Sequence, residues 1–543
     1  MLKPSGTARA SRWLPGRGGL PVRARAARPL GLGGYAAVAA IAGLTLLGLV
    51  LRLAVLGQSL FADELSTWWI VSSNGLGGVV STVHTDAEIT PPLFFVLSWL
   101  STRVDLSPEW LRLPSLAAGT AAVPLTYILG LRTFGRSAGV VAAALTAVSP
   151  FMAFYSVEAR GYELAIVLAL GSTLALLAAV DGGRRRWWIA YAACGCGAVY
   201  SHYTTVFVLV AQLGWLLSAH PEARRPALLA SAGAAVGFLP WLTGLLNDLG
   251  SPTSDIVNAL DVLTLHTARV TLEHWSIGYP YVFPNTPLRE LPGHAALVLL
   301  SLGLVLGVVQ LVLSVRAGWN PLANRRVILV LALALAGPVG VALASIFGTN
   351  IVSVRHLAAS WPALAVATAG LFVSNGRRLG WAASVLVTAA LTIGAVKMLE
   401  ERFQRPDYEA AAGFIDASAA PGDVVIDTAT LSPAPSTGMR VALDRPHPLF
   451  DVGRPLVQYD PFKVLAGAPP TAAVTQRAVA RARGRRIFVV DNEVVNARTP
   501  PAQTPLARQV TAALPRDYRL TAARTYPGIL AVSVRVYEKR PPR

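Results

Sequence analysis

The run LGGYAAVAAIAGLTLLGLVLRLAVL, from Leu32 to Leu56, is followed directly by GQSLFADELSTWW, from Gly57 to Trp69. The first stretch exceeds the roughly 20 apolar residues that a helix needs to cross a bilayer. The second stretch places two acids, Asp63 and Glu64, shortly after that run. Because an ionised carboxylate beside a membrane-spanning segment is costly to bury, we expect these two acids to have a function.

The composition of the chain is that of a membrane protein. Of its 543 residues, 53% are hydrophobic and only 14% are charged, whereas a soluble domain averages about 25% charged residues. The formal net charge is +18, but the Arg and Lys residues cluster in short loops between apolar runs. That pattern is typical of cytoplasmic loops of membrane proteins, so we expect membrane lipids, and no nucleic acid, as partners.

Apolar stretches of spanning length recur along the chain, and we predict eleven transmembrane helices. Residues 1–33 carry one Lys, six Arg and no acid, which predicts a basic cytoplasmic tail ahead of an uncleaved first helix. The predicted spans are 32–56, 113–131, 138–156, 162–180, 186–202, 203–218, 226–247, 294–315, 325–346, 356–374 and 380–398.

The short segment PPLFFVLSWL, from Pro91 to Leu100, decides the direction of the later spans. It is too short to cross a bilayer easily. If it lies in the outer interface instead, every Arg-rich loop between later spans faces the cytoplasm. We therefore predict a cell-membrane protein with its N-terminus inside and its C-terminus outside.

This orientation brings the unusual polar residues to the outer face. An isolated cluster of this kind also fits the ordinary belt of Tyr, Trp and Arg at a membrane surface. Together, however, the clusters from separate loops indicate a membrane-embedded active site. The candidates for substrate binding, donor phosphate included, are His84, Asp86, Glu158, Arg160, His202, Tyr203, Arg355 and His356.

Several motifs carry a resemblance to a known family. In order, they are SLFADELSTWW, HTDAEITPPLFFVL, WLRLPSLAAG, SPFMAFYSVEARGYEL, SHYT and RHLAASWPALAVATAG. Over about residues 35–400 the chain resembles polytopic glycosyltransferases of the GT-C fold. The group includes protein O-mannosyltransferases, lipid A aminoarabinose transferases and Rgt-type galacturonosyltransferases.

The resemblance implies a polyprenyl-phosphate sugar as donor and a catalytic acid in the first outer loop. By its place in the motif ADE, that acid is Asp63, with Glu64 as its catalytic neighbour. The chain departs from the aminoarabinose transferases, which have a Lys before the Pro of the interfacial segment. The corresponding residues here are ITPP, so contacts to the donor phosphate must come from elsewhere.

The chemistry of such a transfer matches the residues available. A base must deprotonate an acceptor hydroxyl, and cations must stabilise the phosphate leaving group. Asp63 or Glu64 can supply the base. The cations can come from Arg160, Arg355, His202 and His356. We expect an inverting single displacement without a cofactor; a divalent cation held by Asp86 and Glu88 is the alternative.

The composition changes near Glu400, and residues 401–543 are predicted to form a small extracytoplasmic α/β domain. A helical stretch, DYEAAAGFIDASAA, precedes the strand-like runs DVVIDTA, RRIFVVDN and ILAVSVRVYEK. Two Pro-rich stretches, LSPAPSTG and RTPPAQTP, are predicted loops. The domain serves either as a structural cap or as a cover for the active site that helps to bind the acceptor.

Two other functions fit the same fold class, an α-helical integral membrane protein with a GT-C region at 34–400. A transporter or flippase of a lipid-linked sugar would place charges near the membrane midplane and show internal repeats; here the acids lie at one face. A scaffold that has lost catalysis would not need the Asp63–Glu64 pair. The identity of the sugar, and of a lipid, glycan or protein acceptor, stays open.

Overall fold

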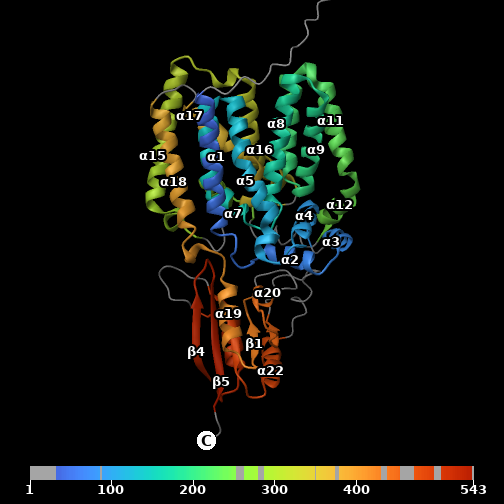
Figure 1. Ribbon diagram of the computed structural model, residues 1–543, viewed down its shortest axis with the longest axis vertical. Coiled ribbons are helices and arrows are strands. Elements are labelled where there is room, and N and C mark those ends of the chain that lie inside the picture. Colours follow the sequence, from blue (N-terminus) through green and yellow to red (C-terminus); the bar gives the residue numbers. More distant parts are fainter. Residues whose placement is uncertain are drawn as a thin grey trace, which may run out of the picture.

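The computed structural model describes residues 32–85, 88–251, 262–278, 286–348, 350–373, 378–429, 437–452, 470–493 and 503–540. Long helices run side by side in a bundle, and a smaller α/β domain lies against one end of it (Figure 1). The basic tail therefore falls outside the described residues, as do most of the two Pro-rich stretches.

The bundle is built from helices that correspond to the eleven predicted spans. In the described part of the chain, eight helical segments are long and apolar enough to cross a membrane. The other three predicted spans contain shorter helices, namely α6, α9 and α10. The bundle helices are α1 (Leu32–Leu53), α5 (Pro108–Thr133), α6 (Arg136–Val148), α8 (Tyr162–Gly182), α9 (Arg185–Ser201), α10 (Thr205–Ala219), α11 (Arg224–Phe238), α15 (His294–Arg316), α16 (Arg325–Phe347), α17 (Trp361–Val373) and α18 (Arg378–Lys397).

Packing in the bundle follows the rules for helices in lipid. Large apolar side chains such as Leu46, Val305 and Val385 lie on its outside, each at least 60% exposed, where a lipid-facing surface needs them. Small residues let helices approach closely. A Cβ on Gly130 of α5 would lie 2.7 Å from the Cα of Gly139 in α6. The predicted α-helical membrane fold is confirmed.

One predicted span is interrupted. The stretch 138–156 was predicted as a single helix, but α6 ends at Val148 and a separate short helix, α7 (Pro150–Tyr155), follows. Pro150 has no backbone N–H to continue the helix, and the preceding residue is driven towards an extended conformation. Ser149 is extended, and its side chain caps α7 by accepting from the N–H of Met152.

Short helices gather at the end of the bundle that faces the C-terminal domain (Figure 1). The segment Gly57–Pro92 is more ordered than a plain loop, because it contains α2 (Asp63–Ser72) and α3 (Leu76–Val83). The predicted interfacial segment forms α4 (Leu93–Ser101), whose nine residues are too few to cross a bilayer. The remaining short helices of the bundle region are α12 (Leu242–Gly250), α14 (Leu265–Ile277) and the turns η1 (Pro221–Ala223), η2 (Leu239–Trp241), η3 (Arg289–Gly293), η4 (Pro321–Ala323), η5 (Val354–Ser360) and η6 (Glu401–Phe403).

The C-terminal domain is a five-stranded mixed sheet with helices on both faces. The strand order is β2-β1-β3-β5-β4, with β1, β2 and β3 parallel and β5 and β4 antiparallel. The predicted strands and the predicted helix are all present. The elements are α19 (Tyr408–Ser418), β1 (Val424–Asp427), α20 (Gly438–Ala442), β2 (Leu449–Asp451), α22 (Thr471–Ala482), β3 (Ile487–Glu493), α23 (Pro505–Ala513), β4 (Tyr518–Tyr526) and β5 (Ala531–Lys539).

Contacts fix this domain to the bundle. The backbone N–H of Glu409, in α19, donates to Ser59 Oγ at 3.0 Å. The side chain of Val441, in α20, packs against the cluster that contains Leu60 and Phe94. The N–H of Ile529, in the turn between β4 and β5, donates to the carbonyl of Gln404 at 2.8 Å. The domain is therefore seated on the same end of the bundle that holds Asp63.

Candidate functional site

Asp63 begins α2 from an unusual backbone position. Ala62, directly before it, has φ 50° and ψ −121°, a conformation that non-glycine residues rarely adopt and that is often found at functional sites. The Asp63 carboxylate accepts from Arg355 Nη1 at 2.6 Å, and both side chains are more than a quarter exposed. Burial alone would raise the pKa of Asp63, but the charges of Arg355 and Arg160 outweigh it and lower the pKa.

Glu64 points instead into the protein. Its two oxygens accept from Arg112 Nε and Nη2, both at 2.7 Å, and Arg405 Nε lies 3.3 Å away. The backbone N–H of Ala159 also donates to it at 2.9 Å. Burial would raise the pKa of Glu64, but the two guanidinium charges lower it. Glu64 thus joins α2, α5, the segment before α8 and the linker to the C-terminal domain.

Arg160 comes from the segment between α7 and α8. It forms a buried, two-pronged ion pair with Glu88, with distances of 2.5 and 2.9 Å. Although burial disfavours its charge, Glu88 and Asp63 raise the pKa of Arg160 well above its ordinary value. The next residue, Gly161, lets this segment lie against the end of α9, since a Cβ there would be 2.5 Å from the Ser201 carbonyl oxygen.

Two of the predicted histidines, His202 and His356, lie next to each other beside this cluster. The ring of His202, just after α9, lies 5.4 Å from the ring of His356 and 5.3 Å from that of Tyr162. His356 Nδ1 is 2.7 Å from the Ile351 carbonyl. Because a carbonyl can only accept, Nδ1 carries the proton. Neutral His356 therefore has its Nε2 as an acceptor.

Glu158 lies two residues before Arg160 and is partly buried. Its Oε2 is enclosed, with no hydrogen-bond partner in the described part of the chain. Burial raises the pKa of Glu158 to about 7; Arg405 opposes this shift, whereas the negative charges of Glu64 and Asp63 add to it. The two neighbouring acids Asp63 and Glu64 are therefore held ionised, whereas Glu158 has a pKa near neutral pH.

His84 and Tyr203 lie in a neighbouring cluster that contacts η2 and α12. Tyr203 donates to Asp248 and accepts from Trp241 Nε1. His84 bonds Thr243 and Asn247 through its two ring nitrogens. Asp86 lies outside the described residues. The structure thus assembles Asp63, Glu158, Arg160, His202, Arg355 and His356 from four separate segments. It places His84 and Tyr203 against η2 and α12 instead.

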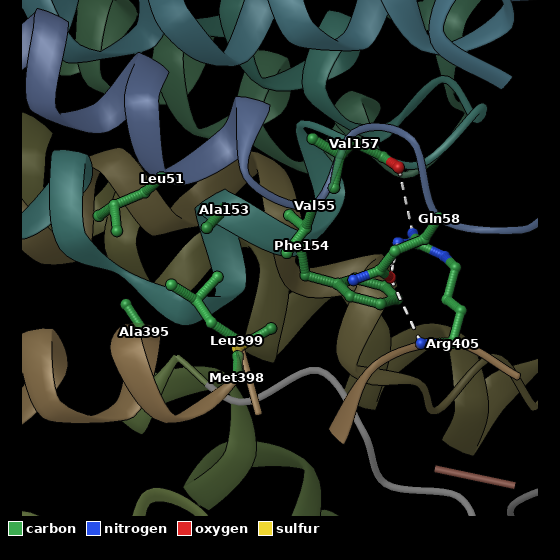
Figure 2. A pocket seen from close by; sticks show the side chains of 10 residues that line it. All are labelled: Leu51, Val55, Gln58, Ala153, Phe154, Val157, Ala395, Met398, Leu399 and Arg405. Carbon is green, nitrogen blue, oxygen red and sulfur yellow. Dashed lines mark hydrogen bonds between the residues drawn. The ribbon is translucent and has the colours of Figure 1, made fainter. Parts of the chain in front are cut away.

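Two residues of this end of the bundle were missing from the predicted site, namely Arg112 and Arg405. Figure 2 shows Arg405 beside a small pocket at the ends of α1 and α18, with bonds to Gln58 and Val157. Its guanidinium also stacks 4.7 Å from the Phe154 ring centre. Arg112 stands in the motif WLRLPS at the start of a span, where a buried charge signals a function.

Metal binding was not predicted for this site. Among the described residues, no group of three or more His, Cys, Asp or Glu side chains is arranged to hold a metal ion. Glu88, the cation ligand considered together with Asp86, is engaged by Arg160.

Comparison with known proteins gives one family match. Residues 90–243, less than a third of the chain, match the family model described as dolichyl-phosphate-mannose-protein mannosyltransferase. This segment runs from just before α4 to the start of α12, and it contains Glu158, Arg160, His202 and Tyr203. No curated protein matches the chain.

The chain also has low-identity likenesses to solved structures. One is ArnT from Cupriavidus metallidurans in the apo state, with 14% identity, a TM-score of 0.48, and coverage of 92% of this chain and 98% of that one. Another is the archaeal oligosaccharyltransferase AglB from Archaeoglobus fulgidus, with 13% identity, a TM-score of 0.47, and coverage of 84% and 69%. The family match confirms the predicted resemblance to the protein O-mannosyltransferase group over residues 90–243.

Proposed function

We propose that this protein is a membrane glycosyltransferase that moves a sugar from a polyprenyl-phosphate donor to an acceptor hydroxyl at the outer face of the membrane. The observation that supports this proposal most directly is the ion pair between Asp63 and Arg355, which lies beside Arg160. A carboxylate and two guanidinium groups are what the reaction requires, one to take a proton and two to bind phosphate. The match of residues 90–243 to the dolichyl-phosphate-mannose-protein mannosyltransferase family supports this donor class.

In this mechanism Asp63 is the base. Its carboxylate is already ionised, and its side chain is partly exposed at the end of α2, so it can accept the proton of an incoming hydroxyl. The hydroxyl oxygen then forms a bond to the anomeric carbon while the bond from that carbon to the phosphate oxygen breaks, which inverts the anomeric centre. Arg355 exchanges its contact with Asp63 for one with the phosphate that leaves.

The acid beside it has a different task. Glu64 is fully buried and holds Arg112 and Arg405, so we assign it a positioning role for α2 rather than contact with substrate. Two further side chains lie around Asp63. One is Arg160, which is paired with Glu88, and the other is neutral His356, whose Nε2 is a hydrogen-bond acceptor. Glu158 supplies a second carboxyl whose pKa suits proton exchange near neutral pH.

The test is sugar transfer by the purified protein with a panel of polyprenyl-phosphate sugars and a mixed acceptor extract. We expect one donor to be consumed, with release of polyprenyl phosphate. Asp63→Asn keeps the size of the side chain but removes its basicity, so turnover should fall about 10²–10⁴-fold. Asp105→Asn, an exposed residue of the next loop, is the matched control and should leave turnover unchanged.

The same assay separates the proposal from a flippase. A flippase would move the labelled lipid across a vesicle membrane without cleaving its sugar–phosphate bond. Translocation without cleavage by the wild type, or normal turnover by Asp63→Asn, would contradict the mechanism. If Glu64→Gln alone abolished the chemical step in a folded protein, the roles of the two acids would be exchanged.

A further inference from the structure

The parallel strands of the C-terminal domain end in a group of polar side chains. Strand order β2-β1-β3 reverses direction at β1, since the chain goes from β1 outward to β2 and then crosses back to β3. The connection through α20 packs with α19 on one face, and α22 packs on the other. In open α/β sheets, the crevice outside the carboxyl ends of the strands at such a reversal is the usual place for a ligand.

Three of these side chains share one face and one end of the sheet. Asp427 at the end of β1 pairs in register with Asp451 of β2 and with Val490 of β3. Asn492 lies two residues beyond Val490 and therefore points to the same face. The face is the one covered by α19, because Val490 packs with Tyr408.

Each of the three side chains has a polar atom without a partner among the residues that the structure describes. Asp427 Oδ1 accepts from the N–H of Ala429, and Asn492 Oδ1 accepts from the Tyr408 hydroxyl at 2.7 Å. Asp451 Oδ2 accepts from Arg440 at 2.5 Å. Asp427 Oδ2, Asp451 Oδ1 and Asn492 Nδ2 are enclosed, and no described residue forms a hydrogen bond with them. Asp427 and Asn492 are themselves 0% and 6% exposed.

Unpaired buried polar atoms are costly, at about 1–3 kcal/mol each, so three of them at one edge require an explanation. They offer two acceptors and one amide donor. Two acidic residues disfavour an anion, and no group of three metal ligands is formed among the described residues. Neighbouring hydroxyl groups, which both donate and accept, fit this set. The exposed Arg440–Asp451 pair marks the side from which the group can be reached.

The edge also faces the bundle. β3 ends at Glu493, opposite Ala531 at the start of β5, and the turn just before β5 is bonded to Gln404. Tyr408, which holds Asn492, is three residues from Arg405, and Arg405 contacts Glu64 beside Asp63. A short path of contacts therefore joins this group to the proposed catalytic acid.

We propose that the carboxyl ends of β1, β2 and β3 bind the hydroxyl-rich part of a neutral glycan or polyol through Asp427, Asp451 and Asn492. Calling that ligand the acceptor rests on the proposed function. The C-terminal domain would then select the acceptor and hold it near the end of α2. This site binds its ligand by hydrogen bonds only and takes no part in the transfer of the sugar.

The test is binding of methyl α-mannoside to the full-length protein in lipid nanodiscs, which avoid sugar-headed detergents, measured by saturation-transfer difference NMR. We expect saturable binding that Asn492→Leu and Asp451→Asn each weaken about tenfold, the cost of one lost hydrogen bond of about 1.4 kcal/mol. Asp451 is partly exposed, so its variant retains the fold even if Asn492→Leu does not. Asp517→Asn, at the opposite end of the sheet, is the matched control and should bind normally.

Asp63→Asn should also bind the glycoside normally, which separates this site from the catalytic one. If transfer fails in every assay but the glycoside still binds through Asn492 and Asp451, only the proposed function falls. The binding proposal is overturned if the wild type shows no saturable signal, because the three atoms are then satisfied by water. It is equally overturned if both variants bind like the wild type, or if glucose 1-phosphate binds better than the neutral glycoside.

Discussion

At Glu64, one buried carboxylate meets two guanidinium groups and a backbone N–H. Such an arrangement offsets the cost of burying charge only while all partners remain. Two residues earlier, Ala62 adopts a backbone conformation that favours glycine. The residue between them, Asp63, is thus held by an anchored neighbour on one side and a strained turn on the other.

The anchoring role predicts a large loss of stability in Glu64→Gln. The amide keeps the volume but removes the carboxylate that pairs with Arg112 and contacts Arg405, and breaking a buried pair costs about 3–5 kcal/mol. We expect the unfolding temperature of the purified protein to fall markedly in a thermal denaturation experiment. Glu109→Gln, an exposed acid at the start of α5, should unfold like the wild type; equal behaviour of both variants would refute the role.

The strained turn predicts the opposite effect for Ala62→Gly. Glycine adopts φ 50° without steric cost, so the change should stabilise the protein by about 1 kcal/mol. The same substitution at exposed Ala117, inside α5, should destabilise it by about 1 kcal/mol. Denaturant midpoints of the two variants against the wild type measure both effects. A loss of stability in Ala62→Gly would show that Ala62 is not strained.

At the scale of elements, the sequence predicted those helices and strands that have a clear local pattern of apolar residues. The long apolar runs became helices, and the strands β1, β3 and β5 coincide with runs rich in Val and Ile. Strand β2 has only three residues, and β4, YRLTAARTY, is exposed along most of its length, so neither leaves a hydrophobic alternation to detect. Helices α2 and α3 have only ten and eight residues, too few for a clear helical period.

The ion pairs of the site could not be predicted from local sequence patterns. Asp63 and Arg355 were both identified, but their contact joins segments almost three hundred residues apart, and only the fold reveals it. Arg112 was missed because a lone Arg beside an apolar run resembles an ordinary interfacial anchor. Arg405 was missed because it lies in the charged stretch EERFQR, beyond the last predicted span. The pairing of Arg160 with Glu88 likewise needed the structure.

The segment before α8 predicts a pH dependence of stability through Glu158. Its folded pKa of about 7 lies above its ordinary value of 4.5, so the folded state binds this proton more tightly than the unfolded state. The stability it contributes is full below pH 4.5 and is lost as the pH rises through about 7. As the pH rises across this range, the unfolding temperature should fall less steeply in Glu158→Gln than in the wild type or in Glu109→Gln. Parallel curves for all three would contradict the assignment.

For the whole molecule, the two ends of the bundle differ in character. At one end lie Asp63, Arg355 and the C-terminal domain (Figure 1). At the other, Arg326 bonds Asp181 at the end of α8 and the carbonyl of Arg132 at the end of α5. The Arg-rich loops thus gather at one end, which under the positive-inside rule is the cytoplasmic one. The site and the C-terminal domain should accordingly lie outside.

Cysteine labelling in intact cells tests this orientation on a single helix. In a background with Cys194→Ala and Cys196→Ala, the exposed positions Asp105 and Ser137 flank α5 at its two ends. Asp105→Cys should react with a membrane-impermeant thiol reagent, whereas Ser137→Cys should react only after the membrane is permeabilised. Ala480→Cys, on the exposed face of α22, should react like Asp105→Cys, because the C-terminal domain lies at the end of the bundle that holds α2 (Figure 1).

If all three labelling patterns are reversed, the site faces the cytoplasm and the proposed reaction at the outer face is wrong. If Ala480→Cys follows Ser137→Cys instead, the C-terminal domain is not seated beside the site, and the acceptor-binding proposal loses its geometric basis.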